Sequence, residues 1–506
     1  MRLIPASLFF VLPLLPALAL AQASLPPAVE AAFNKTNVPV QAFSAIVMPA
    51  NGGAAVLTQV ADRPMNPASA MKLVTTLVGL EELGPNFRWK TQILADKAAK
   101  KNNDSLTGTM YLRGGGDPNL TIEKLSSMLR NLRNQGLRRL RGDLILDRSY
   151  FQPERPDIGA PQFDEFPDAY YNVIPDSLLV NSNLSSISIE SAGDKIEARL
   201  NTPLDKVKIT NHLHFNELPC SAWETEWLPP VIETTSNVID DPEAENPNAP
   251  ATKKPVRQTT RGGLEITLNG GFPKRCKITN NINILDRNQY IAHLIRALWQ
   301  EMGGTWQGEV RDGKTPASAT VLTERVSEPL ADILRIINKQ SDNVMARTLY
   351  LTLGAESGST GSKQGMSHLQ AADARIRQWL FKQGINDAGL VLENGAGLSR
   401  TERISPQQMA GLLQAGARSN WYAEFASSLP VASLDGTMRR RLKGGPAELR
   451  ARIKTGTLKD VVAVAGYVRD INDQQWVVVA MINHDEAARA KAALDELINW
   501  VAAGRP

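Results

Sequence analysis

The two ends of the chain carry complementary parts of one folded unit, and this constrains the fold more than any other feature. Near the N-terminus, apolar segments at 41–49 and 54–60 flank Asn51-Gly52-Gly53, a pattern typical of a β-hairpin. A helix with apolar residues on nearly every face, and therefore a buried helix, is predicted for 68–83. Near the C-terminus, the pattern predicts three strands and a helix, over 452–458, 461–469, 475–482 and 486–503. A hairpin and three strands from opposite ends can share one antiparallel sheet, so the middle of the chain must be an insertion that leaves and returns.

The middle of the chain, from about 86 to 283, has a different pattern. Short alternating segments, such as 186–189 and 196–200, are separated by turns such as Ala192-Gly193-Asp194, which predicts mostly β structure. One amphipathic helix is expected near 121–135. Since 506 residues suffice for about three domains, we predict a multidomain α/β (α+β) chain. It would have an antiparallel sheet with flanking helices and two mostly β inserted domains.

Composition and charge exclude several classes of protein. Hydrophobic residues make up 42% and charged residues 21%, which is typical of a globular protein rather than a disordered chain or a collagen. The 56 Lys and Arg against 52 Asp and Glu leave a net charge of +4 with no basic run, so no nucleic-acid partner is expected. Two cysteines and five histidines are too few and too scattered for a Cys/His zinc site. We therefore expect neither a metal nor another cofactor.

Residues 1–21 have the pattern of a secretory signal peptide. A basic start precedes an apolar run from Leu3 to Leu20, and small-x-small cleavage sites lie around Ala21. An uncleaved membrane anchor is the alternative, but three prolines interrupt the apolar run. No cysteine follows the run, which argues against a lipoprotein. We expect an exported, periplasmic protein, soluble or loosely membrane-associated, with no transmembrane anchor after cleavage.

Export to an oxidising compartment predicts the redox state of the two cysteines. Cys220 and Cys276 are expected to form a disulfide, because that is the usual state of a cysteine pair outside the cytoplasm. Two buried free thiols remain the alternative.

Three short motifs occur in order along the chain. Ser69-Ala70-Met71-Lys72 is S-x-x-K at the start of the predicted buried helix, and Ser341-Asp342-Asn343 is S-D-N before another helix. Lys454-Thr455-Gly456-Thr457 is K-T-G-T on a predicted strand. S-x-x-K alone should arise by chance about once or twice in a chain of this length, but all three in this order indicate one site. A structural interpretation also stays open, since Ser, Asp and Asn cap helices well and a strand lysine can be solvated.

The spacing of the first motif suits nucleophilic chemistry. Ser69 and Lys72 lie one turn apart on the same helix face, so the lysine can reach the hydroxyl. A serine hydroxyl needs a base to take its proton, and none of the histidines lies in a recognisable catalytic motif, so Lys72 is the expected base. Its pKa must then fall from about 10.4 to near 7. We expect burial and the charge of Lys454 to cause this.

With these motifs, the sequence resembles the serine penicillin-binding proteins. Within them it is similar to the class C low-molecular-mass type, the D-alanyl-D-alanine carboxypeptidase/endopeptidase family. Further family-like segments lie at 114–118, 142–147, 394–400 and 435–437. The long interval between Ser69 and Ser341 also resembles this family, which fills it with two extra domains, one nested in the other. The expected boundaries are 22–85 and 284–506 for a β-lactamase/transpeptidase-like catalytic domain, 86–97 and 175–283 for inserted domain II, and 98–174 for the nested domain III.

The resemblance implies catalytic roles for five residues of the motifs. Ser69 is the nucleophile that becomes acylated, and Lys72 takes its proton. Ser341 relays a proton to the leaving D-alanine. Asn343 holds the substrate amide and helps to fix the lysine of the first motif. Lys454 contributes positive charge.

Five further residues are expected to bind the substrate. The resemblance implies that the hydroxyls of Thr455 and Thr457 bind the terminal carboxylate and that Gly456 lets the substrate backbone lie against the strand. It also implies an oxyanion hole formed by the backbone N–H groups of the nucleophile and of Thr457. Arg400 is a candidate for a substrate carboxylate, and Asp168 is a candidate for a substrate side-chain amine.

The predicted function is a serine DD-peptidase of peptidoglycan stem peptides. It would cut terminal D-Ala-D-Ala, D-alanyl cross-links or both, and β-lactams would be its covalent inhibitors. A β-lactamase on the same core is one alternative, but class A enzymes need a glutamate in an E-x-x-L-N segment, and none lies between 341 and 454. A non-catalytic cell-wall scaffold is another, although such a protein could have lost Lys72 or Asn343, and both are present.

Overall fold

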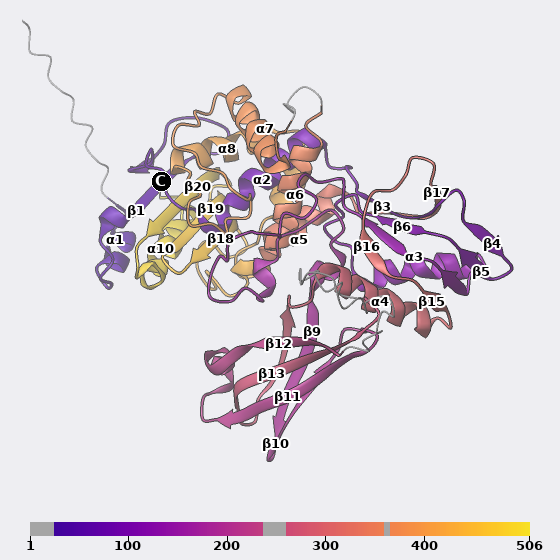
Figure 1. Cartoon of the computed structure of the whole chain (residues 1–506). Helices are drawn as coiled ribbons and strands as arrows, with labels where there is room; N and C mark the ends of the chain where they lie inside the picture. Colours follow the sequence, from indigo (N-terminus) through magenta and orange to yellow (C-terminus); the bar gives the residue numbers. More distant parts are fainter. Residues whose placement is uncertain (1–24, 236–259, 359–364, 506) are drawn as a thin grey trace, which may run out of the picture.

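The two ends of the chain share one antiparallel sheet, as predicted (Figure 1, indigo and yellow). The computed structural model describes residues 25–235, 260–358 and 365–505, so the predicted signal peptide lies outside the described residues. Within these ranges, no helix is long and apolar enough to cross a membrane. The sheet has the order β18-β19-β20-β1-β2 with antiparallel neighbours throughout. Its strands are β18 (Ala451–Leu458), β19 (Val461–Arg469), β20 (Gln475–Asn483), β1 (Phe43–Pro49) and β2 (Leu57–Gln59).

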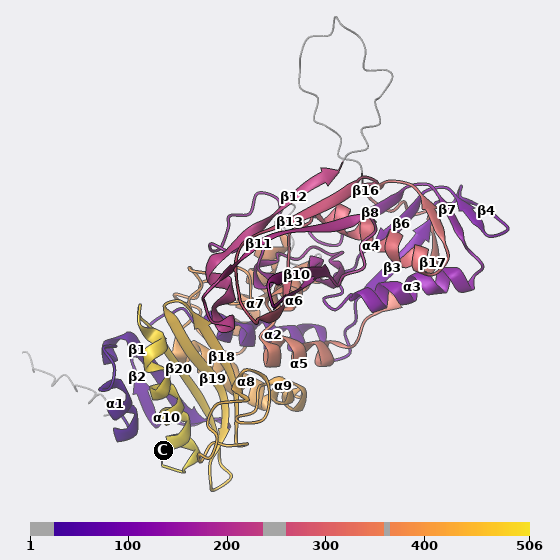
Figure 2. The same cartoon turned by 90° about the horizontal axis from the view of Figure 1, so that it is seen from below.

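Helices cover both faces of this sheet, and alternate residues of β1 show the division. Ile46 and Met48 belong to the hydrophobic cluster of one face, whereas Ala45 and Val47 belong to that of the other. The helices of the first face are α2 (Lys72–Leu83), α5 (Leu330–Gln340), α6 (Asn343–Ala355), α7 (His368–Lys382), α8 (Pro406–Arg418) and α9 (Tyr422–Ser428). Those of the second face are α1 (Pro27–Phe33) and α10 (Lys491–Ala502) (Figure 2). We call this sheet with its helices the terminal unit.

A second unit lies beside the terminal unit and contains two sheets with helices α3 (Ile122–Asn134) and α4 (Arg287–Glu301) (Figure 1). One sheet has the order β16 (Val310–Asp312), β8 (Leu144–Asp147), β6 (Met110–Arg113), β3 (Lys90–Ala95) and β17 (Thr320–Val326). The other has the order β15 (Thr305–Gln307), β7 (Arg139–Arg141), β5 (Ser105–Thr107) and β4 (Lys100–Asn102). Apolar residues of both helices pack into one cluster with these strands. We call this the middle unit.

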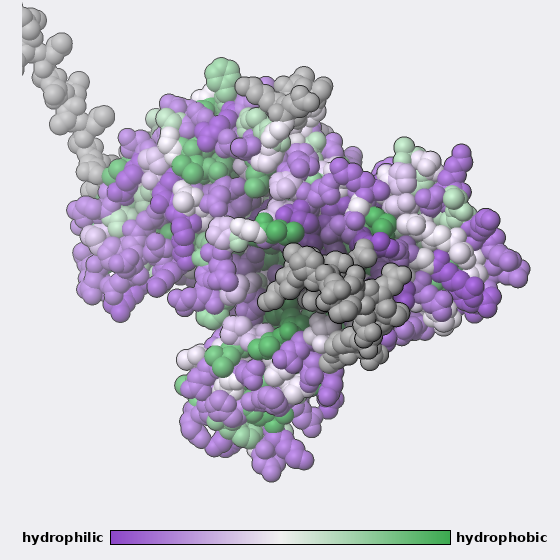
Figure 3. Space-filling view, viewed as in Figure 1, coloured by the Kyte–Doolittle hydropathy of each residue, from purple (hydrophilic) through white to green (hydrophobic). Residues whose placement is uncertain are grey.

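Six further strands form a small β unit, which hangs below the other two in Figure 1. Three of them form one sheet, β10 (Lys195–Leu200), β9 (Ser185–Ala192) and β14 (Lys277–Ile282), and three form the other, β11 (Val207–Asn216), β13 (Gly263–Pro273) and β12 (Trp227–Thr235). The predicted disulfide is confirmed, because Cys220 and Cys276 are bonded with their Cα atoms 5.2 Å apart. Figure 3 shows a hollow between the β unit and the units above it, with apolar residues along its edge.

The strand pairing divides the inserted region differently from the predicted boundaries. The segment expected as a nested domain, 98–174, pairs through β6 with β3 of the expected domain II. It also pairs through β7 and β8 with β15 and β16, which lie beyond 284 in the expected catalytic domain. The piece inserted into the middle unit is instead the β unit. Parallel pairings between segments far apart in the sequence produce this arrangement, and local patterns carry no signal for them. The predicted α+β fold class is confirmed.

Candidate active site

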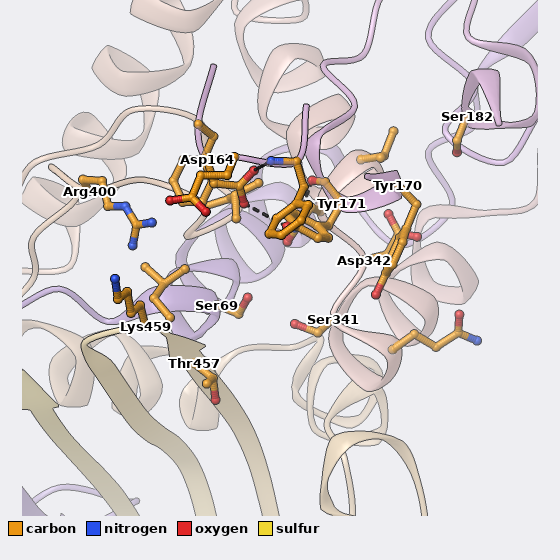
Figure 4. A pocket seen from close by; sticks show the side chains of 18 of the residues that line it. Ser69, Asp164, Tyr170, Tyr171, Ser182, Ser341, Asp342, Arg400, Thr457 and Lys459 are labelled. Atoms are coloured by element: carbon orange, nitrogen blue, oxygen red, sulfur yellow. Dashed lines mark hydrogen bonds between the residues drawn. The ribbon is translucent and has the colours of Figure 1, made fainter. Parts of the chain in front are cut away.

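The first motif lies where a short 3₁₀ turn meets the buried helix. Residues Ala68–Met71 form the 3₁₀ turn η2, and α2 continues from Lys72. The predicted helix over 68–83 is therefore present, with 3₁₀ geometry in the turn that carries the serine. Ser69 is half-buried between the fully buried Ala68 and Ala70, and it borders the open space seen in Figure 4.

Lys72 is fully buried and makes three polar contacts with its ammonium nitrogen. Its Nζ lies 3.0 Å from Ser69 Oγ, 2.6 Å from Asn343 Oδ1 and 2.5 Å from the Ala396 carbonyl oxygen. The first two contacts bring the S-x-x-K and S-D-N motifs together. The third comes from the family-like segment at 394–400, in which the backbone rather than a side chain makes the contact.

Burial lowers the pKa of Lys72 to about 7, close to the value that a general base needs. The negative charges of Asp342 and Glu402 oppose this effect and raise the pKa. The cation that lowers it further is Arg347 rather than the expected Lys454. Lys454 is itself fully buried, and burial together with the charge of Lys72 lowers its pKa well below the ordinary value.

The second motif combines a structural role with direct contacts to the other two motifs. Ser341 ends α5 in a left-handed conformation with φ of 60°, and Asp342 caps α6 by accepting a hydrogen bond from Met345 N. The interpretation of this motif as a helix cap therefore holds for Asp342. Its neighbours face the site, because Lys454 Nζ donates to Ser341 Oγ at 2.9 Å and Asn343 contacts the buried lysine.

The third motif places β18 against the 3₁₀ turn. A Cβ atom on Gly456 would lie 2.2 Å from the Pro67 carbonyl oxygen, so this strand can approach η2 only with glycine here. Thr457 is exposed and lines the pocket. Thr455 is not among the described residues that line the pocket, and its hydroxyl donates to the Thr437 hydroxyl at 2.8 Å.

The open space in front of these motifs is a pocket of about 870 Å³ between the terminal unit and an inserted segment. Ser69, Ser341 and Thr457 face this space in Figure 4, with Arg400 and Lys459 on one side of it. The inserted segment contributes the opposite wall through Phe163, Asp164, Glu165, Phe166, Tyr170 and Tyr171. This wall is joined to the second motif, because Asn343 Nδ2 donates to the Tyr171 carbonyl oxygen at 3.2 Å.

The two softer candidates differ in their placement. Arg400 lines the pocket, where its guanidinium lies 4.7 Å from the centre of the Phe163 ring. Asp168 is not among the described residues that line this pocket, and its backbone carbonyl instead accepts from Asn283 N. The nearby carboxylates that do line it are Asp164 and Glu165. Among the residues described, no group of three or more His, Cys, Asp or Glu side chains could hold a metal ion.

Sequence reasoning missed several groups of this site. Asp164 accepts hydrogen bonds from the Tyr171 hydroxyl and from Asn172, and nothing in the local sequence distinguishes it from the predicted Asp168. Arg347 and Glu402 act on the buried lysine through their charges. The segment at 394–400 is one of the family-like segments, but its contact with Lys72 comes from a backbone carbonyl, which no sequence pattern marks.

Comparisons with known proteins agree with this geometry. A family model described as "D-Ala-D-Ala carboxypeptidase 3 (S13) family" matches residues 27–223 and 228–503. The chain is 28% identical over 442 residues to a D-alanyl-D-alanine carboxypeptidase of an Actinomadura species, covering 85% of this chain and 76% of that protein. It is 25% identical over 421 residues to the D-alanyl-D-alanine carboxypeptidase DacB of Haemophilus influenzae, covering 83% of this chain and 80% of that protein. The crystal structure of penicillin binding protein 4 (dacB) from Haemophilus influenzae has the same fold, with a TM-score of 0.73 at 21% identity, covering 94% of this chain and 99% of that one.

Proposed function

The chain belongs to the D-Ala-D-Ala carboxypeptidase 3 (S13) family, and we propose that it cleaves D-alanyl peptide bonds of peptidoglycan stem peptides through an acyl-enzyme on Ser69. The enzyme is a serine DD-peptidase. One observation carries the choice of nucleophile and base: Ser69 Oγ lies 3.0 Å from the Nζ of a fully buried lysine whose pKa is about 7. A lysine in this state can accept the serine proton at neutral pH.

Acylation follows from the contacts of the three motifs. Neutral Lys72 takes the proton of Ser69 Oγ, and the oxygen attacks the carbonyl carbon of the penultimate D-alanine. The oxyanion that forms accepts hydrogen bonds from the backbone N–H groups of Ser69 and Thr457. As the C–N bond breaks, the leaving nitrogen receives the proton that left the nucleophile, relayed by the Ser341 hydroxyl, which Lys454 Nζ contacts at 2.9 Å. Lys72 is then neutral again and takes a proton from the water that hydrolyses the ester.

The pocket offers groups for both ends of the substrate. Lys454 supplies positive charge for the terminal carboxylate, and the hydroxyls of Thr455 and Thr457 donate hydrogen bonds to it. On the other side of the nucleophile, Arg400 and Lys459 are cations that could meet a second carboxylate of the stem peptide, although Arg400 also lies 3.8 Å from Asp460. A substrate amine would meet Asp164 or Glu165 rather than Asp168, because these two carboxylates line the pocket.

Two other hypotheses about the function have less support. A β-lactamase would need a group that activates water for rapid deacylation, and the chain has no E-x-x-L-N segment between 341 and 454. A non-catalytic scaffold would not need a buried lysine in contact with both Ser69 and Asn343. β-Lactams are therefore proposed as covalent inhibitors that acylate the serine and leave slowly.

We also propose that the protein works in the periplasm. The support for this is the signal-peptide pattern of residues 1–21 and the disulfide between Cys220 and Cys276, a bond that forms in oxidising compartments. N-terminal sequencing of protein recovered from the periplasmic fraction would show whether the leader is cleaved near Ala21.

Digestion of purified peptidoglycan tests the reaction and its balance. Released D-alanine would demonstrate carboxypeptidase action, and conversion of cross-linked dimers to monomers would demonstrate endopeptidase action. A fluorescent penicillin should label the same protein, and mass spectrometry should place the label on Ser69. Absence of both products and of the label would contradict the proposed function, while rapid multiple turnover of penicillin would favour a β-lactamase.

A further inference from the structure

A buried carboxylate close to the catalytic lysine has no role in the mechanism described so far. Glu402 is completely buried, and one of its oxygens, Oε1, accepts three backbone hydrogen bonds. The donors are the N–H groups of Glu393, Asn394 and Gly395, at 3.2, 3.0 and 3.1 Å. The other oxygen, Oε2, is also buried and has no hydrogen-bond partner among the described residues. Three N–H groups converging on one oxygen form an anion-binding nest that fixes the backbone around it.

The loop that Glu402 fixes supports both partners of the catalytic pair. The next residue in this loop is Ala396, whose carbonyl oxygen accepts from Lys72 Nζ. Gly397 follows with φ of 76°, and a Cβ atom on it would lie 2.7 Å from Ser69 N. The loop therefore touches the base through a hydrogen bond and the nucleophile through close backbone packing. Any change in the loop would move the lysine relative to the serine.

We propose that Glu402 is the positioning residue of the general base: it fixes the loop whose Ala396 carbonyl binds Lys72, and its buried negative charge acts on the lysine ammonium. This inference rests on the proposed function, since it concerns the same lysine. Glu402 is not among the described residues that line the pocket, and it is not expected to touch the substrate.

The charged groups around Lys72 determine in which direction loss of the Glu402 charge would shift the pKa of the lysine. Glu402 and Asp342 raise the pKa of Lys72, and Arg347 lowers it, against the dominant effect of burial. Lys454 is a second buried lysine of the site, and burial together with the charge of Lys72 lowers its pKa. Burial raises the pKa of Glu402 above its ordinary value, the three N–H donors oppose this rise, and the negative charge of Glu393 adds to it. Removing the Glu402 charge should therefore lower the pKa of Lys72 below about 7.

The variant that separates charge from shape is Glu402→Gln. Glutamine keeps a carbonyl oxygen that can accept the three N–H groups, but it carries no charge. The measurement is the rate constant for acylation by a fluorescent penicillin as a function of pH. We expect the acid limb of the profile to move to lower pH by about half a unit to one unit. The plateau rate should fall severalfold, because a lysine with a lower pKa is a weaker base.

Glu301→Gln is the matched control, because Glu301 is exposed at the end of α4 in the middle unit. It removes the same charge far from the pocket and should leave the midpoint unchanged. Glu402→Asp keeps the charge but shortens the side chain, so it should keep the midpoint and lower the plateau. This second variant tests the positioning role if the glutamine variant does not fold, as judged by circular dichroism.

Each outcome is decisive. A wild-type midpoint in folded Glu402→Gln would overturn the electrostatic role, and a wild-type plateau in Glu402→Asp would overturn the positioning role. If wild-type protein is not acylated at all, the proposed function fails instead, which is a different result from acylation with an unshifted profile.

Discussion

The terminal unit and the β unit are both built on β-sheets, but they are stabilised in different ways. In β19 and β20, almost every residue is buried, because helices cover both faces of the sheet. In β10 and β11, by contrast, no position is buried and every residue is half-buried or exposed. The cluster of fully buried apolar residues in the β unit is correspondingly small, and it includes Cys276 of the disulfide. The first unit is stabilised by layered packing, and the second depends in addition on a covalent bond.

The denser packing of the terminal unit explains why the catalytic residues lie there. Ser69, Asn343 and Lys454 come from η2, α6 and β18, which all pack on the core of the terminal unit. Contacts of 2.6 to 3.0 Å between such groups require a backbone that does not move. The inserted region contributes the wall from Phe163 to Tyr171 together with Ser182 and Leu184, and we expect these residues to act in substrate recognition rather than in chemistry. The predictions below test this division of labour, beginning with the largest effect.

Removing the nucleophile should abolish the chemistry and leave both units folded. We expect Ser69→Ala to lose acylation by penicillin and release of D-alanine by at least about 1,000-fold, because no other hydroxyl of the described residues contacts the buried base. Mass spectrometry of labelled protein measures the first activity, and a D-alanine assay measures the second. Ser127→Ala, at an exposed position of α3, is the control and should behave like wild type. Retained labelling of the Ser69 variant would refute the assignment.

The state of Lys72 should set the pH dependence. The base must be neutral to take the serine proton, and its pKa is about 7, so acylation should rise with pH through this value and then level off. Below about pH 6, each unit of pH should cost about tenfold in rate, because the neutral fraction falls by that factor. Stopped-flow acylation between pH 5 and 9 checks this, with circular dichroism to show that the fold persists. A flat profile over this range would mean that another group is the base.

The same contrast explains how much of the molecule the sequence could predict. The sheet and α2 were predictable, because dense apolar patterns at both ends of the chain leave few other arrangements. The motifs were predictable because each chemical role demands a particular residue type. The nesting of the inserted units was not, since it depends on parallel pairings such as β8 with β16. Nor were the Ala396 carbonyl contact and the choice of Arg347 over Lys454, because both depend on where folded loops and helices place distant groups.

The K-T-G-T strand should bind the terminal carboxylate of the substrate and so favour an acid over an amide. A charge-assisted hydrogen bond in a shielded site is worth roughly 2–3 kcal/mol, which corresponds to about 30- to 150-fold in rate. We expect amidation of the terminal D-alanine to slow cleavage at least about tenfold, and Thr455→Val to erase most of the difference between acid and amide. Comparison of kcat/KM for the two substrates measures this ratio.

Thr437→Val is the matched control for this strand. It removes the hydroxyl that accepts from Thr455 Oγ1 but leaves the Thr455 hydroxyl in place. The acid-to-amide ratio should therefore remain close to wild type in this variant. If the ratio survives in Thr455→Val as well, the oxyanion hole and Lys454 account for the discrimination, and Thr455 only shapes the strand.

The smallest effect on activity is expected from the disulfide, although its effect on the β unit is large. Cys220 and Cys276 are 56 positions apart, and closing such a loop stabilises the folded state by about 4 kcal/mol in the chain-entropy model. In the double variant Cys220→Ala/Cys276→Ala, we expect amide hydrogen exchange to accelerate in β9–β14. Exchange in β18–β20 and the rate of acylation at Ser69 should change by less than about twofold, because the core of the terminal unit shares no residue with that of the β unit. Thiol titration of denatured, unreduced wild-type protein should find no free cysteine. Parallel loss of protection in both units would mean that they unfold together, and the distinction between packed and cross-linked units would not describe this protein.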